Sequence, residues 1–455
     1  MKKKTVSRIL AVMLSAGLMF AMAGCGGGAK DSADNSGKAE EQTSQAEETK
    51  AEETEEAGEG EDNSKSGLHE VYTLKERNAM SGLTSPDMED RSGIEKALPT
   101  EEKDGLKIGL SMGQMGSDFF TAMVDSAQDA CDSYGYDLVI LNADSNISTQ
   151  SADVESLITM GVDAIILNPM DVTASAADVQ NAVDAGIPVI GVGVDYPSDV
   201  PVVTSILANN YFGGWYTGLY AGEYFEGKHL TSAALLGMMG HTIDESRING
   251  MIAGIIYTRA QQNGEPFDSQ EDAYLEANEM FNELRDKGSM HSKKWDFDIV
   301  AQGEGLWTIE GGLSAAEDII AGNPDLNLFL SSTDSMGQGA VTAIEGAGLT
   351  PGEDIYVACG ADGSQPVFKL LESDSILVTG YNSPNLNGAA PIDLLHMIFE
   401  EGYDANNLPA ASDLPNASIS KENWKDYHDP DLMYCKILPF EFKTIDQIRA
   451  DAGLD

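Results

Sequence analysis

Two carboxylates, one arginine, one amide and three aromatic rings form the set of side chains in this sequence that is best suited to binding a small ligand. All but one of them lie at or just after an expected strand end, or at an expected helix start. The set is Phe119, Phe120, Asp195, Arg247, Trp307, Asp362 and Asn382. Carboxylates accept hydrogen bonds from adjacent hydroxyls, a guanidinium donates to them in pairs, and aromatic rings cover apolar C–H faces. This combination favours a polyhydroxylated ligand such as a sugar.

Each of these residues also has a purely structural interpretation. The Phe119–Phe120 pair could open a helix as two core residues, and Trp307 could lie at a surface or an interface. Arg247 could pair with surface carboxylates, which are abundant in this chain. Asp362 lies in Gly-Ala-Asp-Gly and Asn382 precedes Ser-Pro, and both residue types are common in turns and helix caps. The sequence leaves these alternatives open.

The segments that must position these side chains alternate between short apolar runs and longer amphipathic stretches. In the first half we expect helices at 119–134, 149–160 and 174–185, between strands at 106–112, 136–141, 162–167 and 187–192. The second half has expected strands at 231–237, 297–301, 326–331, 355–358 and 376–379. Continuous Val/Ile/Leu runs indicate parallel strands buried on both faces, and short β–α alternation indicates doubly wound sheets.

These units are too many for one ordinary open sheet, so the sequence predicts an α/β protein with two similar doubly wound lobes. The first lobe is expected to comprise residues 105–209 plus 384–412. The second comprises 210–383, with a polar insertion at about 258–294. Crossing hinge segments join the lobes, and the ligand is expected in the cleft between them, at the carboxyl ends of the strands. An irregular lead-in at 67–104 precedes the lobes, and a C-terminal extension at 413–455 follows them.

The N-terminus predicts export and a membrane anchor. Residues 1–24 join a basic start to the apolar run Ile9–Ala23, which is typical of a signal peptide and short for a membrane span. The run ends in Met-Ala-Gly-Cys25, which resembles the lipobox of bacterial lipoproteins and implies a lipidated Cys25 on the outer face of the cytoplasmic membrane. The alternative is an ordinary signal peptide with an incidental cysteine. Residues 25–66 are acidic and poor in apolar side chains, which predicts a disordered tether.

Seven short segments resemble, in the same order, those of the type I periplasmic binding proteins of the ribose and galactose group. They are Lys107–Leu110 with Asp118–Phe120, Gly161–Ile166, Ala185–Ile190, Ser246–Gly250, Thr333–Ala340, Gly360–Gly363 and Thr379–Pro384. The resemblance covers residues 106–400. It implies a sugar receptor that closes on its ligand and delivers it to the permease subunits of an ABC transporter.

The resemblance also extends the candidate site and marks where this chain departs from the family. Asp118 falls in the family's first ligand loop, and Thr333 stands where the family usually has a ligand-binding Asn. Ribose-type receptors have Asp-Arg where this chain has Asp195-Tyr196. The receptor class is unaffected by these differences, but they leave room for a ligand other than ribose.

Composition and missing motifs exclude several other functions. The chain has 27 Lys and Arg against 75 Asp and Glu, a formal net charge of −48, which argues against a nucleic-acid partner. Nucleotide-binding, zinc-protease and serine-hydrolase motifs are missing, and the six histidines lack metal-ligand spacing. We therefore predict a binding protein, not an enzyme, with no cofactor and no metal. The alternatives are a two-carboxylate glycosidase and a lipid-anchored sensor that presents a sugar-like signal to a membrane receptor kinase or chemoreceptor.

Overall fold

The computed structural model describes residues 93–197 and 199–452. The predicted signal peptide, Cys25, the acidic tether and most of the predicted lead-in lie outside these residues. In the described part of the chain, no helix combines the length and the apolar composition needed to cross a membrane.

Six strands form the first sheet, in the spatial order β12-β5-β4-β3-β1-β2, and each neighbouring pair is parallel. They are β1 (Lys107–Met112), β2 (Asp137–Asn142), β3 (Ala164–Asn168), β4 (Val189–Val192), β5 (Ser205–Ala208) and β12 (Ala411–Leu414). The inner strands are buried along almost their whole length. Burial on both faces explains why their sequences are mostly continuous apolar runs.

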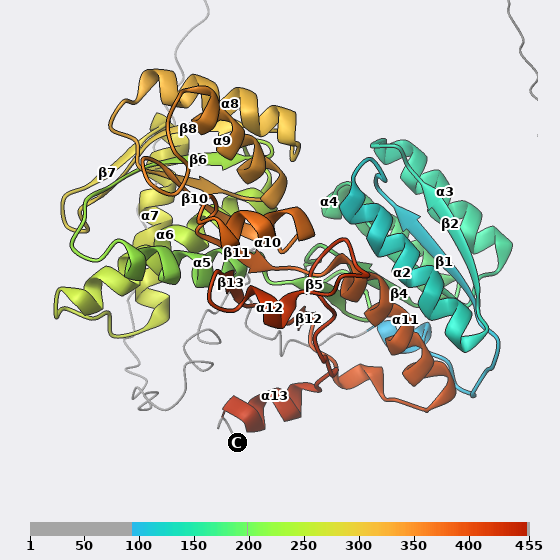
Figure 1. Cartoon of the computed structure of the whole chain (residues 1–455). Coiled ribbons are helices and arrows are strands. Elements are labelled where there is room, and N and C mark those ends of the chain that lie inside the picture. Colours follow the sequence, from blue (N-terminus) through green and yellow to red (C-terminus); the bar gives the residue numbers. More distant parts are fainter. Residues whose placement is uncertain (1–92, 198, 453–455) are drawn as a thin grey trace, which may run out of the picture. The chain divides into compact units, whose positions relative to one another are not determined.

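Four helices complete what we call the first lobe, and the caps of two of them matter for the site. They are α2 (Asp118–Tyr134), α3 (Ile147–Met160), α4 (Val172–Asp184) and α11 (Pro384–Glu400), which packs against α2 (Figure 1). The Ser117 hydroxyl accepts from the backbone N–H of Phe120 at 3.4 Å, and the Asn146 side chain accepts from that of Thr149 at 2.9 Å. These caps start α2 and α3 just beyond the carboxyl ends of β1 and β2.

The second sheet has seven strands in the order β13-β11-β10-β9-β6-β8-β7. They are β6 (Leu230–Leu236), β7 (Met290–Ser292), β8 (Phe297–Glu304), β9 (Leu328–Ser331), β10 (Tyr356–Asp362), β11 (Val378–Tyr381) and β13 (Ser418–Ser420). Its inner pairs are parallel, and the edge strands β7 and β13 are antiparallel to their neighbours. Two sheets dominated by parallel strands confirm the predicted α/β fold class with two doubly wound lobes.

The larger helices of what we call the second lobe lie between residues 210 and 372. They are α5 (Asn210–Tyr224), α6 (Thr242–Gln262), α7 (Gln270–Lys287), α8 (Ile309–Gly322), α9 (Asp334–Gly346) and α10 (Gln365–Glu372). The closest helix pair is α5 and α6, where a Cβ at Gly214 would lie only 1.9 Å from the carbonyl oxygen of Arg247. Only glycine permits this approach, so Gly214 fixes where Arg247 lies in the lobe.

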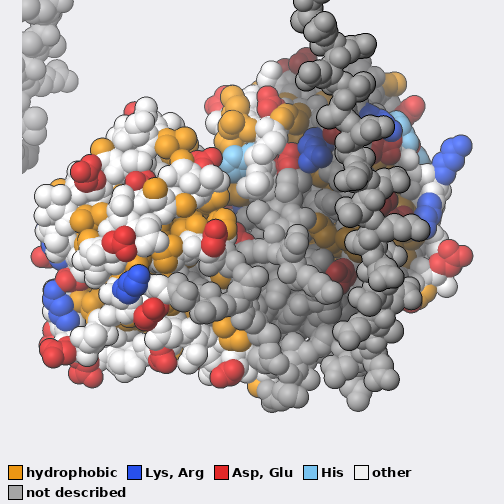
Figure 2. Space-filling model, turned by 180° about the vertical axis from the view of Figure 1, so that it is seen from behind, with side chains coloured by type: hydrophobic (Ala, Val, Ile, Leu, Met, Phe, Trp, Pro, Cys, Tyr) orange, Lys and Arg blue, Asp and Glu red, His pale blue; other side chains and the backbone are white. Residues whose placement is uncertain are grey.

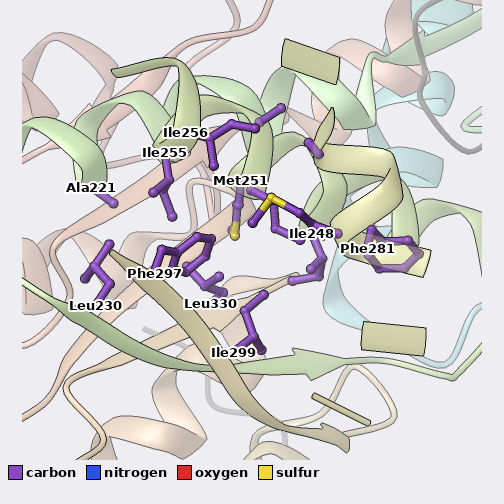
Figure 3. Packing of buried hydrophobic residues seen from close by; sticks show 14 of the residues in the cluster. Ala221, Leu230, Ile248, Met251, Ile255, Ile256, Phe281, Phe297, Ile299 and Leu330 are labelled. Carbon is purple, nitrogen blue, oxygen red and sulfur yellow. The ribbon is translucent and has the colours of Figure 1, made fainter. Parts of the chain in front are cut away.

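The core of the second lobe includes the segment predicted as an insertion. Met251 of α6, Phe281 of α7 and Phe297 of β8 belong to one cluster of buried hydrophobic residues (Figure 3). Tyr274 and Leu284 of α7 lie in the same cluster, with exposed fractions of 2% and 0%. The segment 258–294 is therefore integral to the lobe, because α7 buries one apolar face against it.

Within the described residues, the chain passes between the two lobes at four places. Three of them connect β5 to α5, β11 to α11, and β12 to β13. The fourth lies in the C-terminal segment, where Leu438 packs against the core of the second lobe, while Phe440 and Phe442 pack against the core of the first. Short elements η1 (Ile94–Lys96), η2 (Ala405–Asn407), α12 (Trp424–Tyr427) and α13 (Ile445–Ala452) complete the fold. The C-terminal residues therefore contribute to both lobes.

The acidic composition is distributed over the surface. On the face shown in Figure 2, the Asp and Glu side chains of the described residues are scattered among apolar and polar groups. The few Lys and Arg side chains visible there are likewise dispersed and form no continuous patch. The described residues visible on this face therefore form no phosphate-binding stripe.

Candidate functional site

The carboxyl ends of the parallel strands in the second lobe carry most of the predicted site. Trp307 follows β8, Thr333 follows β9, Asp362 ends β10 and Asn382 follows β11, while Arg247 lies in the first turns of α6 after β6. Because parallel strands all end at the same edge of the sheet, these residues share one rim.

Arg247 is a buried group and does not pair with surface carboxylates. Its Nε donates to Oδ1 of Asn210 at 3.0 Å, and its Nη1 donates to the carbonyl oxygen of Ser332 at 3.2 Å. Its exposed fraction is 6%. Burial raises the pKa of Asp362, and the nearby Arg247 guanidinium opposes this rise. The two groups therefore lie within electrostatic range of each other inside the second lobe.

Trp307 is held by a carboxylate that sequence reasoning missed. Its indole Nε1 donates to Oδ1 of Asp244 at 3.0 Å, and its ring lies edge-on to His241 with 4.9 Å between centroids. Trp307 has a φ of 55°, in the left-handed region, and a Cβ at Gly237 would lie 2.0 Å from its ring. Gly237 and this unusual backbone conformation are therefore both needed to seat the indole.

Asp244 links Trp307 to the end of β9. It is fully buried, at 0% exposure, and also accepts hydrogen bonds from the Ser332 hydroxyl and from the backbone N–H of Met238. Ser332 in turn offers its carbonyl oxygen to Arg247. In the sequence, Asp244 is only an acidic residue in the first turn of a helix, which is common for dipole reasons. Nothing in the sequence pattern distinguishes it as part of this network.

A second carboxylate, Asp334, lies behind Asp362. Its side chain accepts hydrogen bonds from Ser364 N–H at 2.7 Å, from Ser364 Oγ at 2.9 Å and from Thr379 Oγ1 at 2.5 Å. Burial and the neighbouring Asp362 raise the pKa of Asp334 to about 7, while these hydrogen bonds oppose the rise. Asp362 ends β10 at an irregularity in the β10–β11 register and has a φ of 153°. The rim therefore holds two buried carboxylates, Asp244 and Asp334, and the half-buried Asp362 near one guanidinium.

The raised pKa of Asp334 makes stability depend on pH. The folded state binds this proton more tightly than the unfolded state, so the proton stabilises the fold below pH 3.8 and that contribution is lost as the pH rises to about 7. In the wild type, this group makes the free energy of unfolding decrease between pH 4 and 7, by at most about 1.4 kcal/mol per pH unit. Asp334→Asn should lack this part of the decrease. Urea unfolding across this range measures it, with the exposed Asp125→Asn as control. An unchanged pH dependence in Asp334→Asn would contradict the assignment.

The first lobe contributes the start of α2. Asp118 is exposed at the first helical position, and the rings of Phe119 and Phe120 meet edge-to-face at 5.8 Å. Phe120 packs against the core of the first lobe, whereas Phe119 lies edge-on to Tyr434 at 5.7 Å. The pair is therefore divided between a core role and a contact with the C-terminal segment.

The position where ribose-type receptors have arginine belongs to the core here. Tyr196 is 1% exposed, and its hydroxyl lies 2.8 Å from Oγ of Ser175. It therefore does not replace a ligand-binding guanidinium. The adjacent Asp195 follows β4 and is half-buried, and its role stays a prediction.

Thr333 and Asn382 are both buried at element junctions. Thr333 is the N-cap residue of α9, and its hydroxyl has no hydrogen-bond partner among the described residues. Oδ1 of Asn382 accepts from Nδ2 of Asn387 at 3.1 Å, just where the chain passes from β11 to α11. Thr333 therefore offers a free polar group, and Asn382 lies at a crossing between the lobes.

Residues 108–402 match the periplasmic binding protein domain family. The chain belongs to this family. The ribose import binding proteins of Bacillus subtilis and Escherichia coli are 25% and 27% identical to it over 298 and 286 residues. These alignments cover 65% and 63% of this chain, and 83% and 82% of the relatives. A D-ribose/D-allose-binding protein of Pseudomonas aeruginosa is 28% identical over 288 residues, which is 62% of this chain and 79% of that protein.

Solved structures show the same fold as this periplasmic binding protein. A galactofuranose-binding protein has a TM-score of 0.56 at 21% identity and covers 70% of this chain and 96% of its own. A solute-binding protein of Actinobacillus succinogenes with bound D-allose has a TM-score of 0.56 at 24% identity, with coverages of 71% and 100%. Family and fold confirm the predicted type I binding-protein architecture, and with it the expectation of a binding protein instead of an enzyme. The match ends at residue 402, so the C-terminal segment lies outside it.

Proposed function

We propose that this chain is a lipid-anchored solute-binding protein of an ABC importer, which binds a monosaccharide or a similar polyhydroxylated ligand and delivers it to a membrane permease. The observation that carries the proposal is the arrangement of the buried Arg247 with the half-buried Asp362 and Trp307, in which Asp244 and Ser332 hold Trp307 and Arg247. A guanidinium, carboxylates and an indole in one rim match the hydroxyls and C–H faces of a sugar. The named ligands of the relatives, ribose and allose, support this chemistry.

Both lobes supply residues to the proposed ligand site. The proposed ligand-contacting residues are Asp118, Phe119, Phe120, Asp195, Arg247, Trp307, Thr333, Asp362 and Asn382. A ligand that contacts both lobes binds the closed state more tightly than the open one, so binding favours closure. The crossings at β5–α5, β11–α11 and β12–β13 are the segments about which the lobes would move.

The charge of the rim limits the class of ligand. Asp244, Asp334 and Asp362 outnumber the one buried guanidinium that the described part of this rim contains. An anionic ligand would add like charge to a desolvated acidic site, which is costly. We therefore expect neutral sugars and polyols to bind, and sugar phosphates to be rejected.

Calorimetry tests the proposal directly. The full chain, purified in detergent, is titrated with D-ribose, D-allose, D-galactose, myo-inositol and D-ribose 5-phosphate. At least one neutral compound should bind with a Kd below about 100 μM, equivalent to roughly −5.5 kcal/mol, and the phosphate should not bind. Failure of every neutral compound, or preferential binding of the phosphate, would refute the proposed ligand class.

Anchoring and delivery are tested separately. Cys25→Ser should move the chain from the membrane fraction to the soluble fraction after export, because a lipid chain supplies the membrane affinity. Deleting the protein should abolish uptake of the radiolabelled sugar identified by calorimetry. Membrane retention of Cys25→Ser would contradict lipidation, and unchanged uptake would contradict the transport role.

Trp307→Phe should weaken sugar binding by about tenfold. Phenylalanine keeps a smaller aromatic face but lacks the Nε1–H that fixes the ring to Asp244, so the ring covers less of the sugar's C–H face and is held less firmly against it. The matched control is Trp424→Phe, because Trp424 lies on α12 and packs against Phe368 away from this network. Calorimetry with the best-bound sugar compares the two variants. Equal affinities would show that the indole hydrogen bond is irrelevant to binding.

A further inference from the structure

The C-terminal segment is attached to the second lobe at the end of β10. Tyr434 forms an antiparallel bridge with Ser364. Next to this bridge, the backbone N–H of Gln365 donates to the carbonyl oxygen of Met433 at 3.0 Å. The side-chain amide of Gln365 donates to the carbonyl oxygen of Tyr434 at 3.1 Å. The Tyr381 hydroxyl donates to the carbonyl oxygen of Lys436 at 3.0 Å. The backbone around Tyr434 is therefore fixed by several independent hydrogen bonds.

Cys435 anchors the same segment directly on the residue that ends β10. It is fully buried, and its Sγ lies 3.6 Å from the carbonyl oxygen of Asp362. The adjacent Gly363 has a φ of 67°, and a Cβ there would lie 3.1 Å from Cβ of Cys435. A side chain at Gly363 would strain the backbone and crowd Cys435. The segment and the Asp362 turn are therefore fitted to each other.

The Tyr434 ring projects from this anchored backbone toward the first lobe. It is 8% exposed and lies edge-on to Phe119 at 5.7 Å. Burial, together with the charges of Asp362, Asp334 and Asp118, raises its pKa. A phenol thus lies within electrostatic range of carboxylates from both lobes, in its neutral, hydrogen-donating form.

The Tyr434 hydroxyl has no hydrogen-bond partner among the described residues, and its oxygen stays accessible to solvent although the residue as a whole is only 8% exposed. An accessible phenol hydroxyl can both donate and accept a hydrogen bond. A hydroxyl-rich ligand between Phe119 and Asp362 would offer it a hydrogen-bond partner. The ring would also cover one more C–H face of that ligand.

We propose that Tyr434 is a ligand-contacting, specificity-determining residue of the sugar cleft, supplied by a segment that lies outside the matched family region. This inference rests on the proposed function, because it names a further contact to the same ligand. The hydroxyl donates to or accepts from one sugar hydroxyl, and the ring closes the cleft beside Phe119. Tyr434 thereby limits the size of the sugar that fits beside Asp362.

Three variants of the full chain test this by calorimetry with D-ribose, D-allose and D-galactose. Tyr434→Phe should weaken binding of the best of these sugars by about 2- to 10-fold, which is the usual range for one neutral hydrogen bond. Tyr434→Ala should weaken it further and let the cleft accept a disaccharide such as melibiose. Tyr427→Phe is the matched control, because Tyr427 belongs to the same segment but lies against Tyr381. It should bind like the wild type.

A direct contact has a signature that packing alone lacks. The wild type and Tyr434→Phe are compared with monodeoxy analogues of the best-bound sugar. Tyr434→Phe should bind every analogue more weakly than the wild type does, except the analogue that lacks the hydroxyl bound by Tyr434. For that analogue the two proteins should have equal affinities. If Tyr434→Phe loses affinity equally for all analogues, or not at all, the contact is refuted. If Asp362→Asn abolishes binding while both Tyr434 variants bind normally, the proposed function stands and this inference alone fails. If the wild type binds no sugar, both fail.

Discussion

Asp362→Asn is expected to abolish sugar binding while raising the free energy of unfolding. The carboxylate would accept hydrogen bonds from two adjacent sugar hydroxyls, and each such bond to a charged group contributes about 1.5–3 kcal/mol. Losing them should weaken binding by 100-fold or more, since about 1.4 kcal/mol corresponds to a factor of ten. Stability should change in the opposite direction, because burial raises the pKa of Asp362 and its charge is therefore unfavourable in the folded state near neutral pH.

Asparagine is a suitable replacement because it keeps the shape of the side chain. Asp362 has a φ of 153°, and asparagine, which branches at the same carbon, makes the same demands on that backbone as aspartate. Calorimetry measures affinity, and urea unfolding at pH 7 measures stability, with the exposed Asp318→Asn on α8 as control. A variant that binds sugar normally, or one that is clearly less stable than the wild type, would show that Asp362 is a structural residue.

Arg247→Met is expected to abolish binding and to destabilise the fold by about 3–5 kcal/mol, the usual cost of removing one partner from a buried charged network. Methionine fills a similar volume but leaves Asp362 and Asp244 without their nearby cation. It also leaves Oδ1 of Asn210 and the carbonyl oxygen of Ser332 without their donors. Arg247→Lys should recover part of the stability but little of the binding, because an ammonium lacks the planar fork.

A double variant separates the charge from the packing. If the guanidinium stabilises the fold mainly by offsetting Asp362, then Arg247→Met with Asp362→Asn should be less destabilised than Arg247→Met alone. Arg285→Met is the control, because Arg285 is exposed on α7 and lies outside the hydrogen-bond network of Arg247. Urea unfolding of these variants suffices. Simple additivity of the two changes would contradict the coupling between Arg247 and Asp362.

Strands could be predicted from the sequence where burial on both faces leaves a continuous apolar run. The segments of β1, β3 and β4 are buried on both faces, and their apolar runs indicated a parallel sheet. The short strands β5, β12 and β13 have only three or four residues each and were not predicted. Their position is decided by pairing with distant strands, which local patterns do not encode. The charged face of α7 hid from the sequence pattern the apolar face that the structure buries in the second lobe, and the interpretation of 258–294 as an insertion stays a prediction.

Residues of the candidate site could be predicted where they lie in short segments that resemble the family. Arg247 and Asp362 lie close enough to influence each other electrostatically, as the prediction of one shared site requires. Asp244 was missed because its role depends on Trp307, Ser332 and Arg247, which come from three different loops and helices. Tyr434 was missed for a similar reason, since its segment reaches β10 from the far end of the chain.

The C-terminal strands also decide where this protein can be shortened. β12 covers one edge of the first sheet beside β5, and β13 covers one edge of the second beside β11. A chain that ends at residue 402, where the family match stops, would expose both edges to pairing with other molecules. It would also remove the aromatic pair Phe440 and Phe442 from the core of the first lobe. For recombinant expression, the boundary suggested by homology would yield an aggregating fragment, and the last fifty residues belong in any soluble version of the receptor.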